Sequence, residues 1–544
     1  MHRHPHTSLL LLVVCCASVC LAAEPYQCTF DDVVKRGGPQ TIAVVKEVPP
    51  NGQNGWQAYT LSATVGEESE WKPIRILVST EDLKDPTKYC NETTPEEKKP
   101  ATKSAKSKTA VALTAEGTEE RTVVKRPDFQ GRTVTCKEAD LLTAQRKADL
   151  ADKILPAAVK LHTDRLLVKR LAKPFIVPKF DEKSMCSKFK VPDDHRAAGK
   201  GVNADMVLYV AAGPGAPFAL PCAVLDSQGN GRPVAGVMNF PPSGFRDLRL
   251  AVRIAAHEIA HALGFTNRRM VALNMVSYSV ARGRNRPMVK SKMTLEKTKT
   301  HFGCNTAGGM ELQEWIDGSV TSHWSRRNAK DELMSAQIGS RGGYYTALTL
   351  AAFEDMPYYS VNWSMAEPMA WGKDVGCGFL SKACAVEGLT KHPRMLCEGK
   401  KEPTELTNAT LTEISNRILR RQPSPNKGVD FCTSDRLAVG RCSAFTGDVG
   451  EFGDTCPTIA PYLSSKGGSL VTSTCGLKQE MDLSALLAAP LPESNSWCLD
   501  TVASTSATEV SVTPPITGGV CANVKCIDGS KVQVQLEGSD GTKG

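Results

Sequence analysis

Apolar residues fall into distinct patterns along the chain, and each pattern predicts a different element. Continuous apolar runs, RILVST at 75–80 and DMVLYVAAG at 205–213, are typical of buried strands. Helical periodicity runs through ADLLTAQRKADLADKILPAAVKLHTDRL at 139–166 and through RIAAHEIAHALGF at 253–265, where Gly264 supplies a stop. Strands mixed with long helices indicate an α+β fold for this part of the chain.

The later part of the chain has fewer periodic segments. GGYYTALTLAAFEDM at 342–356 predicts one further helix, whereas the region after residue 384 is rich in cysteine and in loop residues. Because 544 residues are too many for a single small core, we expect about three domains. They are an N-terminal catalytic domain at 66–267, a central domain at 268–383 and a cysteine-rich C-terminal domain at 384–544, which we expect to be stabilised by its bridges and to be truncated.

The chain opens with a targeting pattern. A short basic stretch, MHRHPHTS, precedes the apolar run LLLLVVCCASVCLAA at 9–23, after which the sequence turns polar. This pattern predicts a signal peptide at 1–23 and is too short for a comfortable membrane span. Its removal takes three cysteines and leaves 16 of the 19, which favours a disulfide framework in an oxidising compartment. In that setting three sequons predict glycosylation, at Asn91, Asn362 and Asn408.

Charge and the C-terminal residues narrow the possible partners. The net charge of +8 is too diffuse to imply nucleic-acid binding, and the Lys- and Glu-rich stretch at 93–127 predicts a solvated loop. No phosphate loop or nucleotide fingerprint is present. The last residues, VQVQLEGSDGTKG, are polar and lack the apolar tail of a lipid-anchor signal. We therefore expect a secreted protein, or a gene fragment that has lost its anchor signal.

The strongest chemical signal is His257-Glu258-Ile259-Ala260-His261. Positions four apart lie on one helix face, so both imidazoles can bind one metal ion, and the Glu258 carboxylate can reach a water on that ion. Zinc with a neighbouring carboxylate base is the machinery of peptide hydrolysis. The alternative interpretation is a helix with two buried histidines and a surface glutamate.

The third ligand is not fixed by the motif. Gly264 allows the sharp turn of metzincin proteases, but Asn267 stands where their third histidine is expected. His323 has the best surroundings, because Met334 follows in a segment suited to a methionine turn, and His301 is the runner-up. A carboxylate ligand is a further alternative, although Gly264 and the DELM stretch argue against it; the candidates are Glu311, Glu314 and Glu332.

Several separated stretches resemble the leishmanolysins, the surface metalloproteases of trypanosomatid parasites. They are RILVSTEDLKDPTKYC, AAHEIAHALGF, SHWSRRNAKDELMSAQ, GGYYTALTLAAFEDM, WGKDVGCGFL and GVCANVKC, in the family's order and spacing from about Ile76 to Cys526. In that family a long insertion separates the glycine from the third histidine. The resemblance implies a metzincin-type catalytic domain with one zinc ion bound by His257, His261 and His323, with Glu258 as general base and Met334 in the methionine turn.

The resemblance also implies roles for the cysteines. Cys28, in YQCTFDD, matches a pro-segment cysteine whose thiolate blocks the metal, which gives a propeptide at 24–65 with a cysteine switch. Cys526 is left over from the disulfide pairing. The pairs implied are Cys90 with Cys136, Cys186 with Cys222, Cys304 with Cys377, Cys384 with Cys456, Cys397 with Cys442, Cys432 with Cys498, and Cys475 with Cys521.

These observations predict a secreted or surface zinc metalloendopeptidase that cleaves extracellular or host proteins. Its substrates are peptides and proteins, it has no nucleic-acid partner, and membrane attachment is expected only through a lipid anchor whose signal is absent from this sequence. MNFPPSGF at 238–245 is expected to form a cleft edge with a strand that binds substrate by β-addition. The alternative function is a weak or inactive adhesin of the same fold that mediates cell attachment.

Overall fold

The computed structural model describes two compact units. In the large unit (Pro25–Val386 and Gly447–Cys456) the described residues are 26–36, 43–44, 71–91, 125–225, 231–244, 248–315, 317–339, 342–384 and 456. In the small unit the described residues lie within 387–446 and 457–544, namely 392, 395–396, 431–442, 458–461, 463–466, 469–476, 480–481, 496–502, 516–528 and 531–536. The expected domains at 66–267 and 268–383 both fall in the large unit, and the expected signal peptide lies outside the described residues.

A five-stranded sheet forms the base of the large unit. Its order is β2 (Ala43–Val44), β9 (Phe218–Val224), β10 (Pro233–Asn239), β8 (Met206–Ala211) and β4 (Ile76–Ser79). β8 runs parallel to both β4 and β10, whereas β9 is antiparallel to β10. Every residue of β8, β9 and β10 is buried, as expected for continuous apolar runs covered on both faces.

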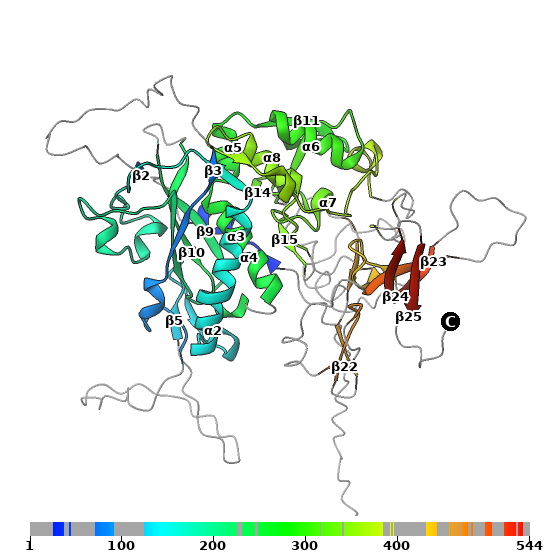
Figure 1. Cartoon of the computed structure of the whole chain (residues 1–544), viewed down its shortest axis with the longest axis horizontal. Helices are drawn as coiled ribbons and strands as arrows, with labels where there is room; N and C mark the ends of the chain where they lie inside the picture. The colour runs from blue at the N-terminus through cyan, green and yellow to red at the C-terminus, as the bar shows by residue number, and fades with distance from the viewer. Residues whose placement is uncertain are drawn as a thin grey trace, which may run out of the picture. The chain divides into compact units, whose positions relative to one another are not determined.

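The two helices that the sequence predicts pack together on this sheet (Figure 1). The first comprises α2 (Ala144–Ala148), a π-helical segment (Asp149–Ile154) and α3 (Leu155–Thr163). Pro156 is the second residue of α3, just after the π-helical segment, and its missing N–H removes one helical hydrogen bond at that point. The second helix, α4 (Leu248–Ala262), packs against α3, β9 and β10.

A second, antiparallel sheet follows in the chain. Its order is β11 (Val276–Ala281), β12 (Arg284–Val289), β13 (Met310–Glu314) and β14 (Val320–Trp324). The helices of this region are α5 (Asn267–Ala272), α6 (Lys292–Phe302), α7 (Arg326–Ala329), α8 (Ala347–Glu354) and α9 (Cys377–Ser381). Short pairings complete the large unit, with β3 (Lys72–Pro73), β7 (Leu166–Val168) and β16 (Ser360–Val361) in one sheet and β5 (Lys125–Pro127) with β6 (Thr133–Thr135) in a hairpin.

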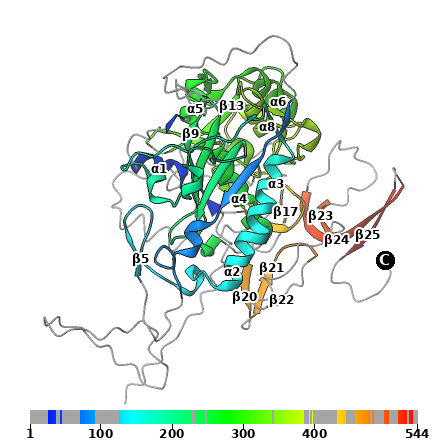
Figure 2. The ribbon, with the colours of Figure 1, turned by 60° about the vertical axis from the view of Figure 1, so that its left-hand side comes forward.

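The first described residues of the chain pack within the large unit. β1 (Tyr26–Gln27) pairs antiparallel with β15 (Gln337–Ile338), and α1 (Phe30–Arg36) packs against β9 and β14. Figure 2 shows α1 beside β9. Cys28, Phe30 and Val33 belong to the same buried apolar cluster as the strands of the five-stranded sheet. This segment, residues 26–36, is called the pro-segment below, after the sequence prediction for 24–65.

The small unit consists of short antiparallel sheets. They are β17 (Phe431–Cys432), β18 (Val439–Cys442) and β19 (Ile459–Pro461); β20 (Leu463–Lys466), β21 (Ser469–Thr472) and β22 (Glu480–Met481); and β23 (Ser496–Val502), β24 (Ile516–Asp528) and β25 (Lys531–Leu536). One buried cluster in this unit is made of three half-cystines, Cys432, Cys475 and Cys498. Across the parts of the chain that the structure describes, no helix has the length and hydropathy needed to span a bilayer.

Candidate metal centre

Helix α4 carries His257 and His261 one turn apart, as the sequence spacing predicts. Both side chains are fully buried, because the face of α4 that bears them lies inside the large unit. The helix ends at Ala262, and Gly264, two residues later, has a φ of 109°, a conformation that disfavours residues with a Cβ atom. The chain then turns so that the backbone carbonyl of Phe265 lies 2.7 Å from Nδ1 of His261.

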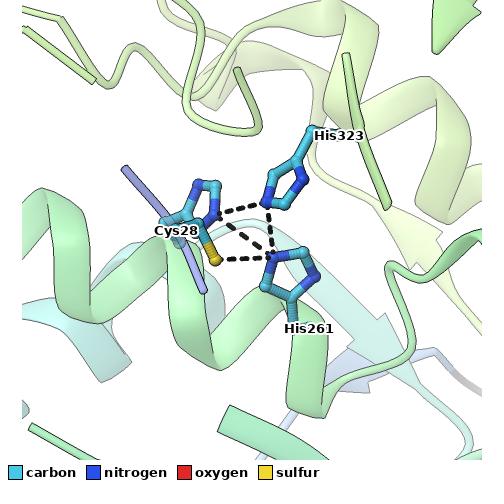
Figure 3. Close-up of side chains that lie close together, drawn as sticks. Cys28, His261 and His323 are labelled. Carbon is cyan, nitrogen blue, oxygen red and sulfur yellow. Dashed lines mark hydrogen bonds between the residues drawn. The ribbon is translucent and has the colours of Figure 1, made fainter. Parts of the chain in front are cut away.

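The third imidazole comes from a distant strand. His323 lies in β14, is 2% exposed, and meets the other two rings at their Nε2 atoms. The Nε2 of His323 is 3.2 Å from that of His257 and 3.2 Å from that of His261. The His257 and His261 Nε2 atoms are also 3.2 Å apart. Figure 3 shows His261 and His323 directed toward one another, with Cys28 beside them.

The outer nitrogens of the rings fix where the protons lie. Nδ1 of His257 contacts the Leu333 carbonyl at 2.6 Å, and Nδ1 of His261 contacts that of Phe265. A carbonyl only accepts, so these Nδ1 atoms donate and the Nε2 atoms keep free lone pairs. Burial, with the other imidazoles adding to it, lowers the pKa of His257 to about 3 and that of His261 well below its usual value.

This arrangement fits a tetrahedral metal ion. Lone pairs that converge at 3.2 Å repel each other unless a cation lies between them. Three nitrogens bound to zinc in tetrahedral geometry stand about 3.3 Å apart, given Zn–N bonds of about 2.0–2.1 Å. Cys28 and the three histidines are also the group of potential ligands that the described residues bring within 4.8 Å of one another. The donor set and spacing therefore suit zinc.

The other sequence candidates for the third ligand lie in different surroundings. His301 places Nε2 2.8 Å from the Trp371 carbonyl. Glu311 pairs with Arg282 at 2.6 Å, and Glu314 with Arg286 at 2.8 Å. None of the three belongs to the histidine cluster found among the described residues.

Glu332 and Met334 shape the backbone beside the cluster. Met334 is fully buried; its amide donates to Glu332 at 2.5 Å, and its carbonyl accepts from the Trp324 amide at 2.8 Å. The preceding carbonyl, that of Leu333, holds His257. This turn therefore joins the helix with two histidines to the strand with the third. Burial raises the pKa of Glu332 to about 7, although its hydrogen bonds lower it in part.

Glu258 is fully buried beside the cluster. Its Oε2 accepts a hydrogen bond from the Ala219 amide of β9 at 3.0 Å. Its Oε1 accepts from the Tyr26 hydroxyl and from the Cys28 thiol, the latter at 3.3 Å. Burial raises the pKa of Glu258 to about 7, with these bonds opposing the rise, so the carboxyl is suited to exchange a proton near neutrality.

The pro-segment covers this site from one side. The Sγ atom of Cys28 lies 3.6 Å from Nε2 of His261 and is unoxidised and buried. Phe30 stacks on the His261 ring, with centroids 4.1 Å apart and planes at 12°. Burial and the Glu258 carboxylate raise the pKa of the Cys28 thiol, whereas a bound cation favours the thiolate.

Asp31 of this segment contacts the strand that carries the third histidine. Its carboxylate lies 3.0 Å from Nδ1 of His323 and also accepts from the Ser322 amide. Burial alone would raise the pKa of Asp31, but its hydrogen bonds with His323 and with the Ser322 amide outweigh burial and lower the pKa. The sequence reasoning missed the contacts of Tyr26, Phe30, Asp31 and Ala219, because none of these residues shares a motif with the groups that it touches.

Six of the expected disulfides are present: Cys90–Cys136, Cys186–Cys222, Cys304–Cys377, Cys384–Cys456, Cys432–Cys498 and Cys475–Cys521. Cys397, the expected partner of Cys442, and the side chain of Cys526 lie outside the described residues.

The expected glycosylation sites differ in their surroundings. The side-chain oxygen of Asn91 accepts from Arg126 at 3.0 Å. The side-chain nitrogen of Asn362 donates to the Asp164 carbonyl at 3.3 Å. Asn408 lies outside the described residues.

The expected substrate-binding edge is wrong. Residues 238–239 of MNFPPSGF end β10, which has β9 on one side and β8 on the other, so its backbone is already paired. The edge strand on this side of the sheet is β2, which pairs with β9 and has Ala43 opposite Ala223. The part of this run that forms a strand thus lies in the interior of the sheet and not at its edge, because an apolar strand covered on both faces suits the middle of a sheet.

Known proteins match this chain over most of its length. The family model described as leishmanolysin, peptidase M8, matches residues 122–543. A leishmanolysin of Leishmania major is 30% identical over 485 residues, which cover 88% of this chain and 72% of that protein. A leishmanolysin homolog of Crithidia fasciculata is 33% identical over 417 residues, covering 73% of this chain and 56% of the relative. A leishmanolysin-like peptidase of Drosophila melanogaster is 26% identical over 368 residues.

The chain thus spans somewhat over half of the Crithidia relative and more of the Leishmania one. The match includes both the helix with two histidines and the strand with the third. The chain belongs to the leishmanolysin family of peptidases.

Proposed function

We propose that this protein is a secreted zinc metalloendopeptidase that cleaves extracellular or host proteins. The observation that carries the proposal is the convergence of three imidazole Nε2 atoms, each 3.2 Å from the others, beside a buried carboxylate. Three neutral imidazoles leave one position of a tetrahedral ion open, which is the arrangement of catalytic rather than structural sites.

His257, His261 and His323 would hold the ion. Zinc, when bound there, supplies the Lewis acidity that amide hydrolysis requires. Glu258 is proposed as the general base: the Ala219 amide holds Oε2 and leaves Oε1 to accept a proton from the attacking water. The protonated Glu258 then donates that proton to the nitrogen of the leaving amine.

The pro-segment is proposed to keep the site latent. Cys28 occupies the side of the cluster where a substrate carbonyl has to approach, and Tyr26 and Cys28 both occupy Oε1 of Glu258. The segment therefore blocks the metal position and the proton acceptor together. Its removal would free both groups. The disulfides of both units favour an oxidising compartment, which supports secretion.

The test is hydrolysis of casein by the processed protein. We expect activity that a chelator abolishes, that zinc restores, and that Glu258→Ala lowers by about 10²–10⁴-fold. Glu182→Ala is the matched control, because this glutamate is 86% exposed and far from the chemistry of the cluster. Activity that survives both the chelator and Glu258→Ala would rule out the metalloprotease, and cell binding that persists without activity would favour the adhesin.

A further inference from the structure

The three histidines of the cluster differ in what holds their outer nitrogen. His257 and His261 are held by the backbone carbonyls of Leu333 and Phe265, which belong to the body of the large unit. His323 is held by Asp31, which belongs to the pro-segment. Cleavage at any point after residue 36 would therefore separate one ligand, and only that one, from the partner described here.

The Asp31 carboxylate contacts the ligand and its backbone together. Oδ2 lies 3.0 Å from Nδ1 of His323, and both carboxylate oxygens lie 3.0 Å from the Ser322 amide. The Asp31 side chain is 16% exposed and that of His323 is 3% exposed, so solvent competes little for this bond. The bond fixes the ring orientation and places the proton on Nδ1, which leaves Nε2 free to bind a metal.

We infer that Asp31 is a positioning residue for the third metal ligand, so that the pro-segment completes the metal site as well as covering it. The inference rests on the proposed zinc site. A carboxylate that accepts from the outer nitrogen of a ligating histidine orients the ring and raises its basicity, and loss of such a partner costs about 10–100-fold in metal affinity. The unprocessed chain therefore binds zinc more tightly than the same site without this carboxylate.

Other contacts hold the pro-segment in place without Asp31. β1 pairs with β15, the Thr29 hydroxyl donates to the Pro217 carbonyl at 3.0 Å, and Phe30 stacks on His261. Removing one carboxylate therefore leaves the segment seated, and its effect on the metal can be measured. The adjacent Asp32 offers a matched control, because it lines a cavity beside Arg36 and Arg132 and not the histidine cluster.

The experiment measures zinc affinity in the full, unprocessed chain by competition with a chromophoric chelator. Asp31→Ala is expected to weaken zinc binding about 10–100-fold and Asp31→Asn by less, because the amide oxygen can still accept from Nδ1. Asp32→Asn is expected to change it less than twofold. The Co²⁺-substituted protein provides a second readout, since a displaced His323 changes the ligand-field absorption.

Each variant is also made in a Cys28→Ser background, so that a change in sulfur ligation cannot account for the result. A persistent loss of affinity in Cys28→Ser/Asp31→Ala supports the inference. Equal affinity of Cys28→Ser and Cys28→Ser/Asp31→Ala overturns it and leaves the zinc site standing. If the unsubstituted chain binds no zinc, the proposed function fails and this inference fails with it.

Discussion

The two compact units differ in what stabilises each of them. The large unit buries whole strands and a helix in an apolar core, and the candidate metal centre lies inside that core. The small unit has a described cluster of three half-cystines, with Val439 and Cys521 packed against it. Burial of continuous apolar runs yields a rigid frame that can hold three imidazoles in a fixed geometry. Covalent bridges stabilise a loop-rich chain but need no such frame.

This difference indicates which unit can hold a functional site. A site with converging lone pairs is costly to form, and only a core with many independent contacts can hold it. In the large unit, Glu258 and the three histidines are all at most 2% exposed. The units should therefore respond to different treatments, and the following experiments test that expectation.

The largest effect is expected from loss of the third ligand. His323→Ala should lower zinc content and casein hydrolysis by about 10³-fold or more, since metal-ion catalysis supplies several kcal/mol of the barrier reduction. His301→Ala is the control, because that histidine contacts the Trp371 carbonyl instead. Metal content measured on the purified chains checks the result. Equal loss in both variants would contradict the assignment of His323.

A smaller effect is expected from the pro-segment. Tyr26→Phe removes one donor to Glu258, and Cys28→Ser removes the thiol beside His261. We expect the double variant to raise the activity of the unprocessed chain about 10–100-fold, since a hydrogen bond to a charged group contributes about 1.5–3 kcal/mol. Lys35→Gln, which breaks an exposed ion pair with Asp317, should change little. An unprocessed double variant that stays as silent as the parent would argue against this form of latency.

Removal of a disulfide is expected to affect the stability of the two units differently. Replacing Cys432 and Cys498 by serine should destabilise the small unit by about 2–5 kcal/mol, because the buried cluster there consists of these half-cystines. Limited proteolysis with sequencing of the fragments checks which unit opens. The matched change is Cys304→Ser with Cys377→Ser, a bridge in the large unit with a similar separation of 73 residues. If the protease digests the large unit first in the Cys432/Cys498 variant, the expected difference in stability between the two units is wrong.

The smallest effect is expected in the pH dependence of folded stability, through a buried histidine that contacts helix α4. His162 is buried, with Nε2 2.8 Å from the Ala256 carbonyl, and burial lowers its pKa from 6.5 to about 3. The unfolded chain binds a proton at this histidine below pH 6.5 whereas the folded chain does not, so folded stability falls as pH drops from 6.5 toward 3. By pH 5 the loss is about 2 kcal/mol relative to pH 7.

His162→Gln cannot titrate and isolates this effect. The variant should be less stable than the parent at pH 7, and the gap between their thermal midpoints should narrow at pH 5. Melting curves of both chains at the two pH values provide the measurement. A gap that stays constant would show that His162 has the same pKa in the folded and unfolded chains, and a gap that widens in acid would show that folding raises its pKa.

The sequence alone determined the parts of the site that lie within one helix. Because a helix repeats every 3.6 residues, the spacing of His257 and His261 sufficed to place both rings on one face, and Gly264 marked the turn that follows. The expected α+β elements and the two long helices are present, and the pairing taken from the family resemblance recurs in six bridges. These features depend on local geometry or on a family-wide pattern.

The tertiary structure alone decided which distant groups meet. His323 was one of several candidates until β14 placed it 3.2 Å from the other two nitrogens, and no pattern linked Asp31 to Ser322 across 291 residues. The same holds for the Ala219 amide on Glu258 and for β10 as an interior strand. Such contacts depend on how sheets and helices pack. Sequence spacing carries information about neighbours within one element, whereas the approach of two elements is set by the whole core.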